Sequence, residues 1–342
     1  MTSADASIVT RPRAQPAWKR LLLSEYLVLA LTIVYFAVMW TIIPEIATAE
    51  TLLDVLRAMM PLLVVAIGQT FVLIVAGIDL SAPSIIAMAS VAGASVLTGD
   101  GGYANGSGFE IVAGILAFIA VGGVIGIFNG MCTTRFNMPS FIVTLTTMMF
   151  FSGAAIWYTT LHTDASSIGN LPRGFIAIGQ GTFFGGLPFS LFVVLAVAGA
   201  AHFILSRTVY GRWLYAVGLN PRAAAVSGVP VRRVIFWAFV ISGTCAAIAS
   251  ILYTGRLETG TPVLGQRILL DVIGAAVIGG VSLFGGKGKI LWTFFGVLFL
   301  TVIDKSLQLM GLPIASVFAI KGSIILAAAI IDALRHRLLV RG

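Results

Sequence analysis

Few residues in this chain have the types and spacing that catalysis needs. The segment GGKGK (residues 285–289) has the glycines and lysines of a phosphate-binding loop, a motif that requires Gly, four residues, Gly-Lys and then Ser or Thr. Here the first position is Val281, and Lys287 is followed by Gly288, so the motif fails twice. The 3 histidines and 2 cysteines have no metal-ligand spacing. We therefore expect no catalytic residue, no metal site and no cofactor in this chain.

Ionisable side chains in apolar surroundings are the other candidates for a function. Asp304 and Lys321 lie inside apolar segments, and Asp79 and Asp271 lie near the ends of theirs. Charges in a membrane are costly and usually face a substrate or ion pathway, but Asp304 and Lys321 could equally neutralise each other between adjacent helices. Asp79 could cap a helix that opens near Pro83, or line the pathway. The pathway candidates are Asp79, Ser81, Asn129, Thr144, Asp271, Asp304 and Lys321.

A third feature is a short helix with stop signals at both ends, in the segment GLNPRAAAVSGVPVRR (218–233). Asn220 suits an N-cap and Pro221 suits the first helical position. Gly228 can adopt the left-handed conformation that ends a helix, and Pro230 prevents its continuation. Two turns are too few to be stable alone, so this helix needs a partner surface.

The elements that position these residues are membrane helices. The chain has 342 residues, of which 58% are hydrophobic and 10% charged, against about 25% charged in soluble domains. Its mean hydropathy is +1.03. A helical crossing takes about 20 apolar residues, so the chain is predicted to be an all-α polytopic membrane protein with about ten transmembrane helices. The predicted spans are 21–43, 59–76, 83–98, 110–131, 140–160, 186–206, 234–254, 268–284, 290–310 and 314–334.

Lys and Arg residues fall mostly in loops on the same side as the N-terminus, which predicts that both termini are cytoplasmic. The chain then has a cytoplasmic tail (1–20), one transmembrane domain (21–334) with a cytoplasmic segment at 207–233, and a cytoplasmic C-terminal tail (335–342). The same distribution explains the net charge of +8 without nucleic acid as a partner, because no folded basic domain remains.

The two halves of the chain are weakly similar at an offset of about 175 residues. LRAMMPLLVVAIGQT from Leu56 aligns with VRRVIFWAFVISGTC from Val231, and further along Asp79 aligns with Asp271. Five spans separate equivalent points, so the repeat is predicted to be inverted in the membrane. Inverted repeats are typical of transporters whose substrate passes between the halves.

Five segments resemble the inner-membrane permeases of ribose/xylose/galactose-type bacterial ABC importers, from about residue 56 to residue 332. They are QTFVLIVAGIDLSAPSIIAM (69–88), FNGMCTTRFNMPSFIVTLTTMMFFSGAA (128–155), GRWLYAVGLNPRAAAVSGVPVRRV (211–234), AAVIGGVSLFGGKGKI (275–290) and KGSIILAAAIID (321–332).

The resemblance implies a permease subunit of an ATP-driven, binding-protein-dependent importer of a monosaccharide or polyol. Its partners would be an ATPase chain with two nucleotide-binding domains that holds ATP and magnesium, a periplasmic binding protein, a second permease and membrane lipids. The short helix would be the coupling helix that docks on the ATPase, with Ala223 to Ala225 as a flat docking surface. The coupling residues would be Asn220, Pro221, Arg222, Ala223, Ala224, Ser227 and Gly228.

Departures from the family pattern leave the substrate open. Ala82-Pro83 replaces the usual Val-Gly, residues 269–271 read LLD rather than ELD, and Ser152-Gly153 stands where Arg-Gly is usual. The alternatives are an ion-coupled secondary transporter, or an ABC permease for branched-chain amino acids.

Overall fold

The computed structural model describes residues 26–183 and 186–340, which are almost entirely helical. The predicted tail at 1–20 lies outside the described residues. The elements are α2 (Leu27–Ile42), η1 (Pro44–Ala47), α3 (Ala49–Ile74), α4 (Ala82–Leu97), α5 (Glu110–Arg135), α6 (Ser140–His162), α7 (Arg173–Gln180), β1 (Thr182–Phe183), β2 (Leu187–Pro188), α8 (Ser190–Arg207), α9 (Val209–Leu219), α10 (Pro221–Val226), α11 (Val231–Leu257), α12 (Leu269–Gly279), α13 (Ile290–Leu309) and α14 (Ile314–Val340).

Six helices of the described chain have the length and apolar composition to cross a membrane: α3, α5, α6, α8, α11 and α13. Four shorter apolar helices, or parts of helices, accompany them: Leu27–Ile42, Ala82–Leu97, Leu269–Gly279 and Ile314–Ile330. Each predicted span therefore contains an apolar helix, and the chain is a multi-pass membrane protein. The count of ten crossings and the inverted repeat remain predictions.

Local capping chemistry accounts for the helix ends that hydropathy misplaced. α3 begins about ten residues before the predicted 59–76 span, because the Thr48 hydroxyl accepts a hydrogen bond from the Thr51 amide and caps the helix. α12 stops short of residue 284 because Gly280, with φ of +112°, ends it in the left-handed conformation. α14 continues to Val340, through most of the predicted tail at 335–342.

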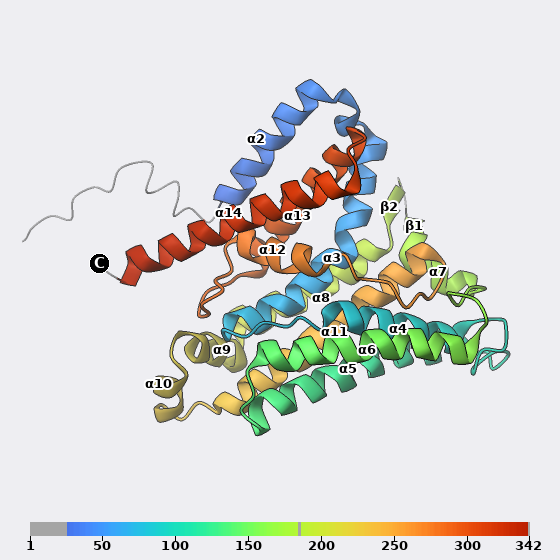
Figure 1. Cartoon of the computed structure of the whole chain (residues 1–342), viewed down its shortest axis with the longest axis horizontal. Helices are drawn as coiled ribbons and strands as arrows, with labels where there is room; N and C mark the ends of the chain where they lie inside the picture. The colour runs from blue at the N-terminus through green and yellow to red at the C-terminus, as the bar shows by residue number, and fades with distance from the viewer. Residues whose placement is uncertain (1–25, 184–185, 341–342) are drawn as a thin grey trace, which may run out of the picture.

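The helices form two groups around a central layer. Figure 1 shows α4, α5 and α6 together on one side, α12, α13 and α14 on the other, and α3 and α11 between them. α10 and the C-terminal end of α14 lie at one end of the molecule, and α7 with the small β1–β2 hairpin lies at the opposite end. The loop predicted for 161–186 thus contains structure of its own, and 207–233 contains α9 in addition to the expected short helix.

α5 and α11 pack closely enough for their backbones to touch. A Cβ atom added at Gly126 would lie 2.8 Å from the Phe239 carbonyl oxygen, and one at Gly130 would lie 2.8 Å from that of Phe236. At Gly122 the added Cβ would overlap the Gly243 carbonyl oxygen. In lipid the hydrophobic effect does not bring helices together. Small residues at such crossings stabilise the contact because they let the two backbones approach closely.

This packing generates a prediction about adjacent glycines. Gly122→Ala should lower the free energy of unfolding by about 1 to 3 kcal/mol, because the new methyl group meets backbone that cannot rotate away. Gly123→Ala is the matched control, since nothing lies within 4 Å of a Cβ at that position. Thermal unfolding of both variants in detergent measures the difference. Equal midpoints for the two variants would contradict the close α5–α11 contact.

Candidate translocation site and coupling helix

Asp79 lies in the short connection between α3 and α4, enclosed by hydrogen-bond donors. One carboxylate oxygen accepts hydrogen bonds from the Ser81 amide (2.9 Å) and hydroxyl (2.6 Å). The other accepts from the Ser242 hydroxyl on α11 (2.7 Å). Asp79 thus holds Ser81, the residue before α4, rather than the first amides of the helix.

The network continues from Ser81 into α5 and α6. The Asn129 amide donates to the Ser81 hydroxyl (2.8 Å), and the Thr147 hydroxyl donates to the Asn129 carbonyl oxygen (2.7 Å). Thr144 donates to the Ile78 carbonyl, so α5 and α6 hold the connection in addition to α11. Four predicted pathway residues, Asp79, Ser81, Asn129 and Thr144, therefore come together in one place.

Burial shows what this network does in the present conformation. Asp79 is 1% exposed, and Ser81, Asn129 and Thr144 are fully buried. A polar network of this kind stabilises the fold only when its members satisfy one another, as they do here. Its role in the structure is to join the α3–α4 connection to α5, α6 and α11.

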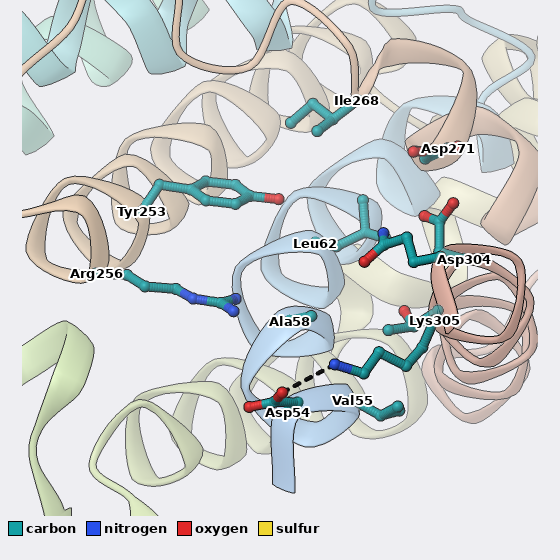
Figure 2. Close-up of a pocket in the computed structure, with 12 residues that line it drawn as sticks. Asp54, Val55, Ala58, Leu62, Tyr253, Arg256, Ile268, Asp271, Asp304 and Lys305 are labelled. Carbon is teal, nitrogen blue, oxygen red and sulfur yellow. Dashed lines mark hydrogen bonds and ion pairs between the residues drawn. The ribbon is translucent and has the colours of Figure 1, made fainter. Parts of the chain in front are cut away.

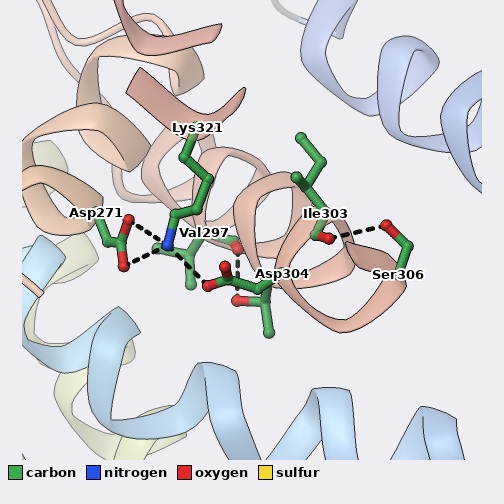
Figure 3. Close-up of polar contacts among 7 residues, drawn as sticks. Asp271, Val297, Ile303, Asp304, Ser306 and Lys321 are labelled. Carbon is green, nitrogen blue, oxygen red and sulfur yellow. Dashed lines mark hydrogen bonds and ion pairs between the residues drawn. The ribbon is translucent and has the colours of Figure 1, made fainter. Parts of the chain in front are cut away.

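The remaining three pathway candidates form a separate charged cluster. The Lys321 ammonium group on α14 lies 2.6 Å from Asp271 on α12 and 2.9 Å from Asp304 on α13. Figure 3 shows the ammonium group between the two carboxylates. The Asp304–Lys321 ion pair, one of the two alternatives that the sequence left open, is present, and Asp271 is a second partner. Lys321 is only 4% exposed, so its charge depends on these two contacts.

A second ion pair lies beside the first, between Lys305 on α13 and Asp54 on α3 (2.9 Å). The polar residues that α13 contributes recur at helical spacing: Thr301, Asp304, Lys305 and Gln308. Positions three and four apart share one face of a helix, so α13 presents a continuous polar face here.

These groups line two adjoining cavities of about 250 and 300 Å³. Both include Ile268, Asp271, Asp304 and Gln308. Figure 2 shows the cavity of about 250 Å³. Tyr253 and Arg256 extend toward it from α11, and Asp304 and Lys305 extend toward it from α13. Within the described part of the chain, the Arg256 and Gln308 side chains make no hydrogen bonds with protein.

Carboxylates, a guanidinium group and an amide together offer both acceptors and donors at short range. Such a lining can hydrogen-bond a small polyhydroxylated molecule. Among the described residues, no group of three His, Cys, Asp or Glu side chains is placed to hold a metal ion.

Sequence reasoning marked Lys305 as an ionisable residue within a span, but it missed other residues of the cavities, namely Asp54, Tyr253, Arg256, Arg267 and Gln308. The 301, 304, 305, 308 spacing was the available signal, because it marks one polar face in an apolar helix. Asp54 and Arg256 gave no such signal, because they join the cavities only through tertiary packing.

The predicted short helix is present as α10, at Pro221–Val226. The Asn220 side-chain oxygen accepts hydrogen bonds from the Arg222 and Ala223 amides (both 3.0 Å), and Pro221 occupies the first turn. Ser227 follows the last turn, and Gly228 has φ of +82°. The capping signals in the sequence are therefore confirmed.

The flat docking surface expected at Ala223 to Ala225 needs correction. Ala224 is 5% exposed and belongs to the chain's own hydrophobic core, so it cannot lie in a partner's groove. Ala223 and Ala225 face outward, and Val226 is 91% exposed. Successive residues of a helix point about 100° apart, so the middle alanine can face the protein while its two neighbours stay exposed.

Comparison with known proteins assigns the chain to a family. The family described as "Branched-chain amino acid transport system / permease component" matches residues 51–331. The ribose import permease of Bacillus subtilis is 33% identical over 84% of this chain and 86% of its own length. The galactose/methyl galactoside import permease of Haemophilus influenzae is 34% identical over 80% and 83%, and the L-arabinose ABC transporter permease of Azospirillum brasilense is 30% identical over 98% and 94%.

No solved structure matches the chain. The match to the family nevertheless spans both groups of helices, from α3 to α14, and includes the Asp79 network, the charged cavities and α10. The chain therefore belongs to this family of transport-system permease components, to which it is related over most of its length.

Proposed function

We propose that this chain is the permease subunit of an ATP-driven importer of a monosaccharide or polyol in the bacterial inner membrane. The observation that carries the proposal is its similarity, over 80–98% of its length, to import permeases named for galactose, ribose and L-arabinose. ATP hydrolysis belongs to a separate ATPase chain with two nucleotide-binding domains, which also holds the magnesium.

The substrate passes along the charged cavities rather than through the Asp79 network. Asp304 is partly exposed, with 27% of its side chain accessible, and it lines both cavities. Arg256 and Gln308 offer donors that the protein does not use. A sugar carries hydroxyl groups around its ring, each able to donate and accept, and this lining provides partners for both roles.

The orientation follows from charge. α10 and both termini face the cytoplasm, and α7 faces the periplasm, where the binding protein delivers substrate to a pair of permeases. The six long helices and the four shorter apolar helices together make ten crossings, arranged as an inverted repeat. The order supports this arrangement, since a long helix is followed by a short apolar one at α3–α4 and again at α11–α12.

Uptake measurements test the function. Cells that produce this chain with the ATPase and binding protein of its own organism should accumulate one of radiolabelled ribose, arabinose, galactose or fructose, and removal of the ATPase should abolish uptake. Labelled leucine is the amino-acid control. Uptake that persists without the ATPase would favour an ion-coupled carrier, and uptake of leucine alone would favour an amino-acid permease.

The orientation yields a prediction about labelling. Single cysteines replacing Arg173 in α7 and Arg222 in α10, in a chain whose Cys132 and Cys245 are replaced by serine, should react from opposite faces of the membrane. An impermeant maleimide applied to intact spheroplasts should modify the first position and not the second. Modification of both positions in sealed spheroplasts would contradict the proposed orientation.

A second prediction concerns Asp304. Asp304→Asn leaves the Lys321–Asp271 pair intact, so the protein should reach the membrane in near-normal amounts. Loss of one charged acceptor should raise the KM for uptake about tenfold. Asp100→Asn, which changes an outer carboxylate that bonds Asn170 and lines neither cavity, is the matched control. An unchanged KM in Asp304→Asn would remove the cavities from the pathway.

The third prediction concerns α10. Val226→Asp places a charge on its most exposed side chain, so it should abolish co-purification of the ATPase and uptake together while leaving the fold unchanged. Val209→Asp, at an exposed position on α9, is the control. Ala224→Trp should instead destabilise the permease itself, because Ala224 is buried. Retention of the ATPase by Val226→Asp would mean that α10 is only a linker.

A further inference from the structure

Three arginines converge at the end of the α5–α11 pair that lies nearest α10. Arg135 is the last residue of α5, and Arg232 and Arg233 lie in the first turn of α11. With Thr134 and Phe236 they line a groove of about 520 Å³. An adjoining groove of about 610 Å³ shares Thr134, Arg232 and Arg233, and extends to Arg222 on α10.

These positive charges are not neutralised by the protein. No Asp or Glu lines either groove, and none of these four arginines forms an ion pair within residues 26–183 and 186–340. The Thr133 hydroxyl in the wider groove is also buried without a hydrogen-bond partner in that part of the chain. The grooves therefore contain several donors and little to accept from them.

The position of the arginines makes an anion favourable. Arg232 and Arg233 occupy the first turn of α11, where the helix dipole disfavours positive charge, and Arg135 adds a third like charge beside them. The preference for basic residues on the cytoplasmic side explains how many arginines lie there, but it does not explain why they line one groove. A guanidinium group presents a planar fork that binds the oxygens of a phosphate in pairs.

Aromatic residues around the groove indicate the level of the lipid headgroups. Phe236 forms part of its wall, and Phe136 and Trp237, which follow Arg135 and Phe236 in the sequence, are 64% and 53% exposed. Tryptophan and tyrosine rings near the ends of membrane helices typically lie at the interface between lipid and water, and Trp237 is such a residue. The ends of α5 and α11 are therefore placed where a phospholipid phosphate is available.

We propose that this groove binds the anionic headgroup of a phospholipid, with its phosphate held by Arg135, Arg232 and Arg233. Basic pockets between membrane helices bind such headgroups on the cytoplasmic side. The acyl chains lie on the exposed apolar faces of α5 and α11. Because the wider groove reaches Arg222, an occupied site also contacts α10. This inference does not depend on which solute the protein carries.

The test uses the purified, delipidated permease in a non-ionic detergent, titrated with phosphatidylglycerol, phosphatidylcholine or inorganic phosphate while the unfolding midpoint is recorded. Phosphatidylglycerol should raise the midpoint more than phosphatidylcholine does. Arg232→Gln/Arg233→Gln should weaken the apparent affinity for phosphatidylglycerol about tenfold or more. Arg212→Gln removes an exposed charge on α9 outside the groove and should retain the full response.

A conservative variant separates lipid binding from general charge. Arg232→Lys/Arg233→Lys keeps both charges but loses the paired hydrogen bonds, so its response should lie between wild type and the glutamine variant. Equal stabilisation by the two lipids, or an equal loss in Arg212→Gln, would overturn the proposal. Full protection by inorganic phosphate would identify a free-anion site instead. Loss of ATPase binding with an unchanged lipid response in the glutamine variant would identify a protein-docking surface.

Discussion

The close approach of α5 and α11 is the contact on which the rest of the structure depends. In lipid there is no hydrophobic force to press two apolar helices together, so contact must come from packing and hydrogen bonds. Gly122, Gly126 and Gly130 leave the backbone of α5 open along one side, and α11 lies against it. The Asp79 network extends this contact, because Ser242 belongs to α11 and Asn129 to α5. Both polar and apolar contacts therefore hold the same pair of helices.

The two polar clusters of the membrane domain satisfy their charges differently, and this difference separates their roles. Asp79 is enclosed by hydroxyl and amide donors and is shielded from solvent. Asp304 shares Lys321 with Asp271 and still faces two cavities. A residue whose hydrogen-bonding capacity is filled by protein holds a structure in place, whereas one with spare capacity beside a cavity can bind a solute. The pathway candidates thus divide into a set enclosed by protein and a set that lines cavities.

Hydropathy and capping residues predicted much of this architecture, because both act locally. Every predicted apolar segment contains a helix, and Asn220, Pro221 and Gly228 bound α10 as expected. Long-range packing was beyond their reach. No local pattern brings Asp54 to Lys305, 251 residues away, or turns Ala224 inward while its neighbours stay exposed. The sequence therefore indicated which types of residue form the candidate site, but it identified only some of the residues that line it.

α11 connects the features that the sequence shows separately. Its first turn carries two arginines of the anion groove, its middle carries Ser242, and its last turns carry Tyr253 and Arg256 of the cavity. At 27 residues it is about 40 Å long and runs without interruption from Val231 to Leu257. Because one helix reaches both ends, we expect a displacement applied near α10 to be transmitted to the cavity wall. The close glycine contacts with α5 and the Ser242–Asp79 hydrogen bond both hold α11 near its middle. Any movement of α11 relative to the α3–α4 connection would therefore have to break the Ser242–Asp79 hydrogen bond.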